Sequence, residues 1–160
     1  MEKTTGQKPG IKWVNDVLVN GKKICGILTE AIPRAVIVGI GVNINLSEDV
    51  FPAGLRESAG SISMDKDTRA RFFSALTDEI FRCVPVAEKT GTAEAIALMD
   101  EYRKRSVLIG KPVILTRGDA PALIQAFCET ITDDGALVVV YDNGYTEELR
   151  TSEVSVRLGE

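Results

Sequence analysis

The 160-residue sequence contains no histidine. This absence excludes Ser-His-Asp and Cys-His nucleophile systems and every metal site built on imidazole. Cysteine is scarce too, and Cys25, Cys83 and Cys128 form no Cys-x-x-Cys pair. Such spacing argues against a disulfide framework or a zinc site and is typical of free thiols in a reducing compartment. Any chemistry would therefore depend on lysine, arginine, carboxylates, amides and the backbone, and we predict no metal site.

Long hydrophobic runs are also lacking. No apolar stretch approaches the roughly 18 residues that span a bilayer, and the N-terminal residues are polar. The sequence therefore predicts no signal peptide and no membrane contact, and we expect a cytoplasmic protein. At 44% hydrophobic and 26% charged residues, the composition is that of a soluble globular chain.

The sequence also lacks an excess of basic residues. The net charge is −4, and residues 108–160 carry four basic against nine acidic groups. Nucleic-acid binding needs clustered lysine and arginine. We therefore predict no nucleic-acid partner for this chain.

The first half of the chain combines strands and helices. Residues 16–19 and 22–28 predict a hairpin around Asn20-Gly21, a pair typical of two-residue turns with positive φ. Residues 35–45 are almost continuously apolar and β-branched, which predicts a central strand buried on both faces. Residues 46–66 predict a loop. Helical spacing of apolar residues predicts helices over 67–84, capped by Asp65 or Asp67, and over 92–105.

The composition changes near residue 108. Short strands separated by turn residues are predicted over 113–117, 123–132, 136–141 and 147–157. This regular spacing predicts a small barrel of about fifty residues. We therefore expect two domains, residues 1–107 and 108–160.

Several polar residues and glycines in the first half have two interpretations. Lys22 and Lys23 could be solvated residues after a turn, and the pair Asn15-Asp16 could serve turn chemistry. Glycines within strands mark either a bulge or a place where a ligand or another backbone comes close; they are Gly26, Gly39 and Gly41. The run from Gly39 to Asn43 lacks the third glycine and the helix of a dinucleotide-binding fingerprint.

Three blocks, in this order and with these gaps, resemble the biotin protein ligases; they are Ile11–Asp16, Asn20–Leu28 and Val38–Asn43. The family's first block is usually Lys-Trp-Pro-Asn-Asp, and Val14 stands here in place of the proline. The C-terminal segments resemble the family's SH3-like final domain; they are Gly110–Val113, Asp134–Leu137 and Glu153–Arg157. The resemblance extends from about residue 8 to residue 157.

The resemblance implies an α+β fold. Residues 1–107 would form part of a class II synthetase-like mixed sheet with helices, and residues 108–160 an SH3-like β-barrel. The family's glycine- and arginine-rich adenylate loop does not occur in these 160 residues, so we expect the C-terminal part of a ligase. The sheet would then have an unpaired edge and an uncovered apolar face, which favours self-association, for example as a homodimer.

The implied activity is ATP-dependent formation of biotinyl-5′-AMP, followed by transfer of biotin to a lysine of a biotin carboxyl carrier protein. Biotin and ATP would be the substrates, with Mg²⁺ accompanying ATP. Lys23 and Asp16 match catalytic positions. Biotin-binding positions would be Lys23, Gly26, Leu28, Gly39 and Gly41. Adenylate-binding positions would be Asn15, Asn43 and Arg157.

Two other functions remain open at this stage. One is a non-catalytic module that binds the carrier protein, and the other is a relative of lipoate-protein ligases, which use a related fold and the same adenylate chemistry. The block from Lys12 to Asp16, together with Lys23 and Gly26, favours biotin over lipoate. Whether this chain is active alone also stays open.

Overall fold

The structure, a computed structural model, describes residues 1–117, 123–150 and 154–159. The chain divides into two compact units, Met1–Arg82 and Cys83–Glu160, which we take one at a time. The predicted domain boundary near residue 108 stays a prediction. Within the described ranges, no helix is long and apolar enough to cross a membrane.

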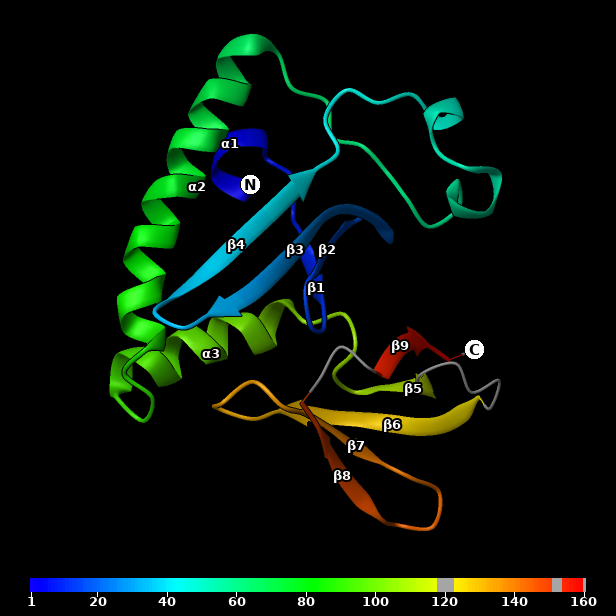
Figure 1. Ribbon diagram of the computed structural model, residues 1–160. Coiled ribbons are helices and arrows are strands. Elements are labelled where there is room, and N and C mark those ends of the chain that lie inside the picture. Colours follow the sequence, from blue (N-terminus) through cyan, green and yellow to red (C-terminus); the bar gives the residue numbers. More distant parts are fainter. Residues whose placement is uncertain (118–122, 151–153, 160) are drawn as a thin grey trace. The chain divides into compact units, whose positions relative to one another are not determined.

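The first unit is built on a four-stranded antiparallel sheet (Figure 1). A short helix, α1 (Glu2–Thr5), precedes it. The strands pair in the order β1 (Gly10–Lys12), β2 (Asp16–Val19), β3 (Lys22–Ile32) and β4 (Ala35–Val42). The predicted hairpin is confirmed, because Asn20 and Gly21 both adopt positive φ, 51° and 77°, between β2 and β3. Isolated parallel bridges, such as Ile44 with Ile62, tie the sheet to the segment that follows it.

The prediction of a central strand buried on both faces over 35–45 is wrong. Strand β4 is the last in the sheet order, and none of its residues is buried. Val36, for example, is 61% exposed. The apolar, β-branched run establishes the extended conformation, but burial depends on what covers the strand. Figure 1 shows β4 at the margin of this sheet, with α2 (Lys66–Ala87) alongside.

Helix α2 closes the core of the first unit at the C-terminal end of β4. Phe72 on the helix packs with Ile62 and Met64, and Val42 and Leu76 contact this cluster. The predicted cap is Asp65, whose Oδ1 accepts a hydrogen bond of 2.6 Å from the backbone N–H of Thr68. The predicted loop between β4 and α2 contains only two short 3₁₀ turns, η1 (Glu48–Val50) and η2 (Ala53–Leu55).

The second unit pairs a helix with a five-stranded antiparallel sheet. The helix predicted over 92–105 is confirmed as α3 (Ala93–Arg105), and Thr92 caps its start. The strands pair in the order β8 (Thr146–Leu149), β7 (Leu137–Val140), β6 (Ile124–Ile131), β5 (Lys111–Arg117) and β9 (Val154–Leu158). The predicted single strand over 147–157 is wrong, because this segment forms β8 and β9 at opposite margins of the sheet.

The core of the second unit consists of buried side chains of its strands β5, β6 and β7. These side chains are almost fully buried; they include Val113, Leu115, Cys128, Ile131, Leu137 and Val139. Helices together with two antiparallel sheets confirm the predicted fold class. The barrel is not closed among the described residues, since no pairing joins β8 to β9 there.

Candidate functional site

An ion pair between Lys23 and Asp16 is the centre of the candidate site. Lys23 Nζ lies 2.5 Å from Asp16 Oδ1, and the two side chains are 47% and 18% exposed. The register between β2 and β3 shifts between Val17 and Leu18, so that Leu18 faces Lys23 while Asp16 faces Gly26. This irregularity brings Lys23 to the same face of the sheet as Asp16 and Gly26, although Lys23 and Gly26 are an odd number of positions apart.

The face that carries this pair also carries the three strand glycines. Gly26 lies opposite Gly41, and Leu28 lies opposite Gly39, in the ladder between β3 and β4. Because side chains alternate along a strand, these positions share one face. The structure thus brings together six of the predicted site residues; they are Asp16, Lys23, Gly26, Leu28, Gly39 and Gly41.

The register of β3 with β4 bears on the two interpretations of these glycines. Pairing runs without interruption from Cys25 with Val42 to Ile32 with Ala35, so no bulge lies between these two strands. On the β2 side the register shifts between Lys23 and Cys25, next to Gly26. At Gly39 and Gly41 the nearest atom to an added Cβ would be a backbone oxygen, 3.7 and 3.9 Å away. The surface is therefore flat there, with Leu28, 73% exposed, rising beside it.

The two asparagines of the predicted site hold neighbouring backbone. Asn15 Nδ2 donates to the carbonyl of Ile27 at 2.7 Å, and the N–H of Ile27 donates to the carbonyl of Asn15 at 2.9 Å. Asn43 Nδ2 donates to the carbonyl of Gly60 at 2.9 Å. Asn15 therefore fixes the chain just before Asp16. The predicted adenylate contacts of both asparagines stay predictions.

Arg157 lies on β9 in the second unit, where it pairs with Ile114 and is exposed. The Lys23 face belongs to the first unit. The predicted role of Arg157 at the nucleotide therefore stays a prediction.

Cys25 lies beneath the ion pair, on the opposite face of the sheet. Burial raises the pKa of its thiol, the charge of Lys23 opposes that rise and the charge of Asp16 adds to it. The thiol is 6% exposed and unpaired, as predicted for the cysteines of this sequence. It is therefore a core group and not a nucleophile of the site.

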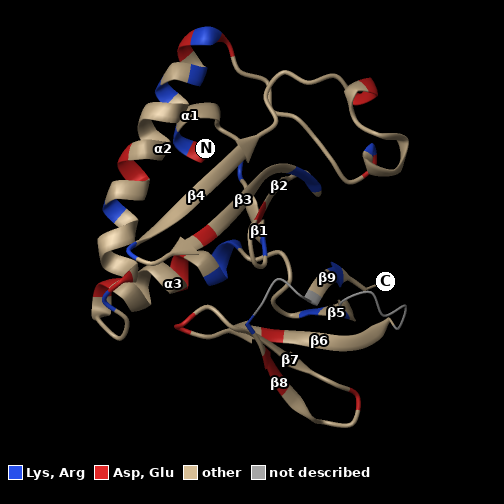
Figure 2. Ribbon diagram, in the orientation of Figure 1, with Lys and Arg blue, Asp and Glu red and all other residues tan. Residues whose placement is uncertain are grey.

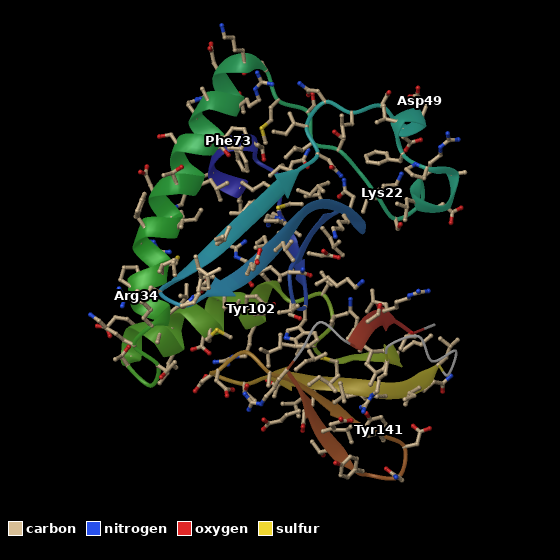
Figure 3. The ribbon with its side chains drawn as sticks, in the orientation of Figure 1. Lys22, Arg34, Asp49, Phe73, Tyr102 and Tyr141 are labelled. Carbon is tan, nitrogen blue, oxygen red and sulfur yellow. The ribbon has the colours of Figure 1, made fainter. Side chains whose placement is uncertain are left out.

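Sequence reasoning missed a hollow of about 250 Å³ in the first unit, between the β2–β3 turn and the loop after β4. Lys22, which points toward that loop, pairs there with Glu48 at 2.8 Å, and this bond lowers the pKa of Glu48 (Figure 3). The hollow is lined by Gln7, Val19, Asn20, Lys22, Ile24, Leu46, Glu48, Phe51, Gly60 and Ser61. Leu46 and Phe51, two of the apolar residues in this loop, are the signal that could have revealed it.

The described part of the chain contains no group of three or more cysteine, aspartate or glutamate side chains placed to hold a metal ion. Asp16, which lies opposite Gly26, is paired with Lys23.

Two family models match the sequence. The Biotin/lipoate A/B protein ligase family matches residues 2–47, and the Biotin protein ligase C terminal domain matches residues 108–157. The bifunctional ligase/repressor BirA of Bacillus subtilis is 46% identical over 68 residues, which are 39% of this chain and 21% of that protein. The biotin--[acetyl-CoA-carboxylase] ligase of Paracoccus denitrificans is 32% identical over 141 residues, 81% of this chain and 55% of that protein.

Solved structures show the same fold. The apo biotin protein ligase of Aquifex aeolicus superposes with a TM-score of 0.76 at 20% identity, covering 99% of this chain and 69% of that one. The complex of that ligase with biotin and ATP gives a TM-score of 0.75 at 22% identity, covering 99% and 66%. The fold is therefore that of the biotin and lipoate ligases.

The second family model and the curated relatives point to a narrower group, and the chain belongs to the biotin protein ligase family. It spans about half the length of the Paracoccus relative and of the Escherichia coli BirA, and about a fifth of the Bacillus relatives.

Proposed function

We propose that this chain supplies the adenylate half-site of an ATP-dependent biotin protein ligase. The proposal rests on one observation, the Lys23–Asp16 ion pair at one end of the flat face formed by the three glycines. The substrates would be biotin and ATP, and the acceptor a lysine of a biotin carboxyl carrier domain. Support comes from the family models and from the relative whose name states this reaction.

The first chemical step suits the residues of this face. A carboxylate oxygen of biotin attacks the α-phosphorus of ATP, the bond to the β-phosphate breaks, and pyrophosphate leaves with its electron pair. Negative charge on the carboxylate and phosphoryl oxygens is stabilised by a fixed cation, which the ammonium of Lys23 provides. The bicyclic body of biotin would lie over the bare backbone at Gly39 and Gly41, against Leu28 and next to the Lys23 ammonium above Gly26.

In the second step the amine of a carrier lysine attacks the acyl carbon of biotinyl-adenylate, an amide bond forms, and AMP leaves. The attacking amine must lose a proton. Asp16, which is only 18% exposed and held at the site by Lys23, is the described carboxylate placed to orient that amine.

Mg²⁺ would enter with the ATP phosphates. No described carboxylate cluster is available to hold it, in keeping with the way Mg²⁺ usually binds through substrate phosphates and water. The contribution of the ion would be to offset phosphate charge, and the residues of this face would bind and orient biotin.

Calorimetric titration of the 160-residue protein with biotinyl-adenylate tests the proposal. We expect Lys23→Ala to weaken binding by about 1.5–3 kcal/mol, the usual loss for a hydrogen bond to a charged group. Lys22→Ala is the matched control, because it makes the same change one residue away at a side chain that pairs with Glu48. A folded protein that binds no adenylate, or equal losses in the two variants, would contradict the proposal.

The same titration separates the two other candidate functions. Competition by lipoyl-adenylate at equal affinity would identify a lipoate ligase, which the first family model also covers. A carrier domain that binds equally well to the unaltered protein and to Lys23→Ala, without nucleotide affinity in either, would identify a non-catalytic carrier-binding module.

We also infer that a second copy of the chain can associate along β4. Support comes from the position of β4 at the edge of its sheet and from the exposure of Val36, Ile37 and Val38. Sedimentation velocity should show dimers whose fraction grows with concentration and falls in Val38→Lys. A monomer at all concentrations would exclude this association.

A further inference from the structure

The three glycines of the face are not equivalent. At Gly26 an added Cβ would lie 3.1 Å from Lys23 Cε and 3.2 Å from Lys23 Nζ. At Gly39 and Gly41 the nearest atoms are backbone oxygens at ordinary contact distances. Only at Gly26, among these three, is the space of the missing side chain already taken by another residue.

The occupant is the end of the Lys23 side chain. Its ammonium lies over the Cα of Gly26 and meets Asp16 Oδ1 at 2.5 Å, while the same oxygen would be 3.8 Å from a Cβ at Gly26. Asp16 and Gly26 are direct partners across β2 and β3. The three residues therefore form one contact, in which Lys23 crosses Gly26 to reach Asp16.

We propose that Gly26 is a positioning residue for Lys23: its missing Cβ leaves the channel in which the Lys23 ammonium lies beside Asp16. This inference rests on the proposed function, since it assigns Gly26 a task in placing the cation of the adenylate site. A glycine that served only as a floor for biotin would act on the ligand directly and would not depend on Lys23.

The substitution that tests this is Gly26→Ala. Gly26 has no positive φ, so alanine suits its backbone, and the crowding atoms are the far end of a half-exposed side chain. The added methyl group should displace the Lys23 ammonium and leave the sheet intact. Gly41→Ala is the matched control, because it lies directly opposite on the same face and does not approach Lys23.

The first measurement needs no ligand. A zero-length carbodiimide cross-link should join Lys23 to Asp16, and the Lys22–Glu48 pair, at 2.8 Å, gives an internal reference in the same sample. We expect the ratio of the two cross-links, measured by peptide mass spectrometry, to fall at least fivefold in Gly26→Ala and to stay unchanged in Gly41→Ala. An unchanged ratio in Gly26→Ala would overturn the inference.

The second measurement is a double-mutant cycle on biotinyl-adenylate affinity. We expect Gly26→Ala to weaken binding about tenfold when Lys23 is present and less than twofold in the Lys23→Ala background. Equal losses in both backgrounds would show that the methyl group meets the ligand itself, and would overturn the inference. If Gly26→Ala alone failed to fold, recovery of folding in the double variant would support it, and failure there would overturn it.

The two ideas fail in different ways. Loss of the proposed function would appear as no adenylate binding in the unaltered protein, whatever the cross-link shows. If Gly26 does not position Lys23, the cross-link ratio should be the same in Gly26→Ala and in the unaltered protein, even though Lys23→Ala still weakens binding.

Discussion

The two sheets of this chain use apolar residues in opposite ways. In the second sheet, Leu137, Val139 and Leu115 are buried and have no exposed surface. In the first sheet, by contrast, Leu28 on β3 is 73% exposed and Val36 on β4 is 61% exposed. One sheet thus packs these apolar residues into the core of its own unit, while the other presents them at the surface.

Charge follows the same division. Figure 2 shows acidic residues over β8 and over the turn between β6 and β7 of the second unit. There they pair locally: Arg103 bonds Asp100 and Asp133, and Arg150 bonds Asp134 and Glu148. On the glycine face of the first sheet, by contrast, the Lys23–Asp16 pair lies where the proposed substrate would compete for the cation. The pairs of the second unit join neighbouring surface residues, whereas the proposed role of the Lys23–Asp16 pair is to meet the substrate.

The largest effect should come from the second core. Leu137→Ala should destabilise that unit by about 3 kcal/mol, because the site is fully buried and cannot easily collapse. Urea unfolding can separate the units, since Trp13 is the sole tryptophan and lies in the first, while all three tyrosines lie in the second. The tyrosine transition should move and the tryptophan transition should not. A coincident shift of both would contradict the division.

Alkaline pH should also affect the second unit. Burial raises the pKa of Cys128 to about 11, so the folded state holds this proton more tightly than the unfolded chain does. The stabilisation is complete below the ordinary thiol pKa near 8.5 and is lost as the pH rises toward 11, with a slope of up to about 1.4 kcal/mol per pH unit. Comparison with Cys128→Ala isolates this contribution, and equal pH profiles would contradict it.

A smaller effect should arise at the start of α2. Asp65→Ala removes the acceptor for the Thr68 N–H and should destabilise the first unit by about 1 kcal/mol. Asp65→Asn, which keeps an acceptor oxygen, should recover most of that loss. The tryptophan transition gives the measurement, and an alanine variant as stable as the unaltered protein would rule out the cap.

The smallest effect should come from the exposed leucine of the first sheet. Leu28→Ala should change stability by less than about 0.5 kcal/mol, in contrast to Leu137→Ala, because its side chain is already in water. Biotinyl-adenylate affinity should nevertheless fall, since the proposed site uses Leu28 as its apolar wall. A large loss of stability would show that the glycine face is covered in solution.

Local patterns in the sequence predicted the elements that local physics determines. The Asn20-Gly21 turn, the cap at Asp65 and the helix over 92–105 all follow from side chains within a few residues of one another. The ordered blocks around Lys23 predicted the residues that share the glycine face.

What the sequence could not reveal depends on contacts between distant segments. An apolar run such as 35–42 looks the same whether or not another layer covers it, so the prediction of burial failed. The division of 147–157 into two strands required pairing with β7 on one side and β5 on the other. The shift between Val17 and Leu18, which brings Lys23 to the face of Asp16, leaves no mark in the residue types.

The reactivity of the three cysteines, none of which forms a disulfide, can report local opening of each unit. Cys25 is buried beneath Lys23 in the first unit, Cys128 is buried in the second, and Cys83 is partly exposed. A thiol reagent can reach the first two only in molecules whose sheet has transiently parted. The labelling rates at Cys25 and Cys128, compared with the fast rate at Cys83, would thus measure how often each unit opens locally. Adenylate that docks on the Lys23 face should slow only the first.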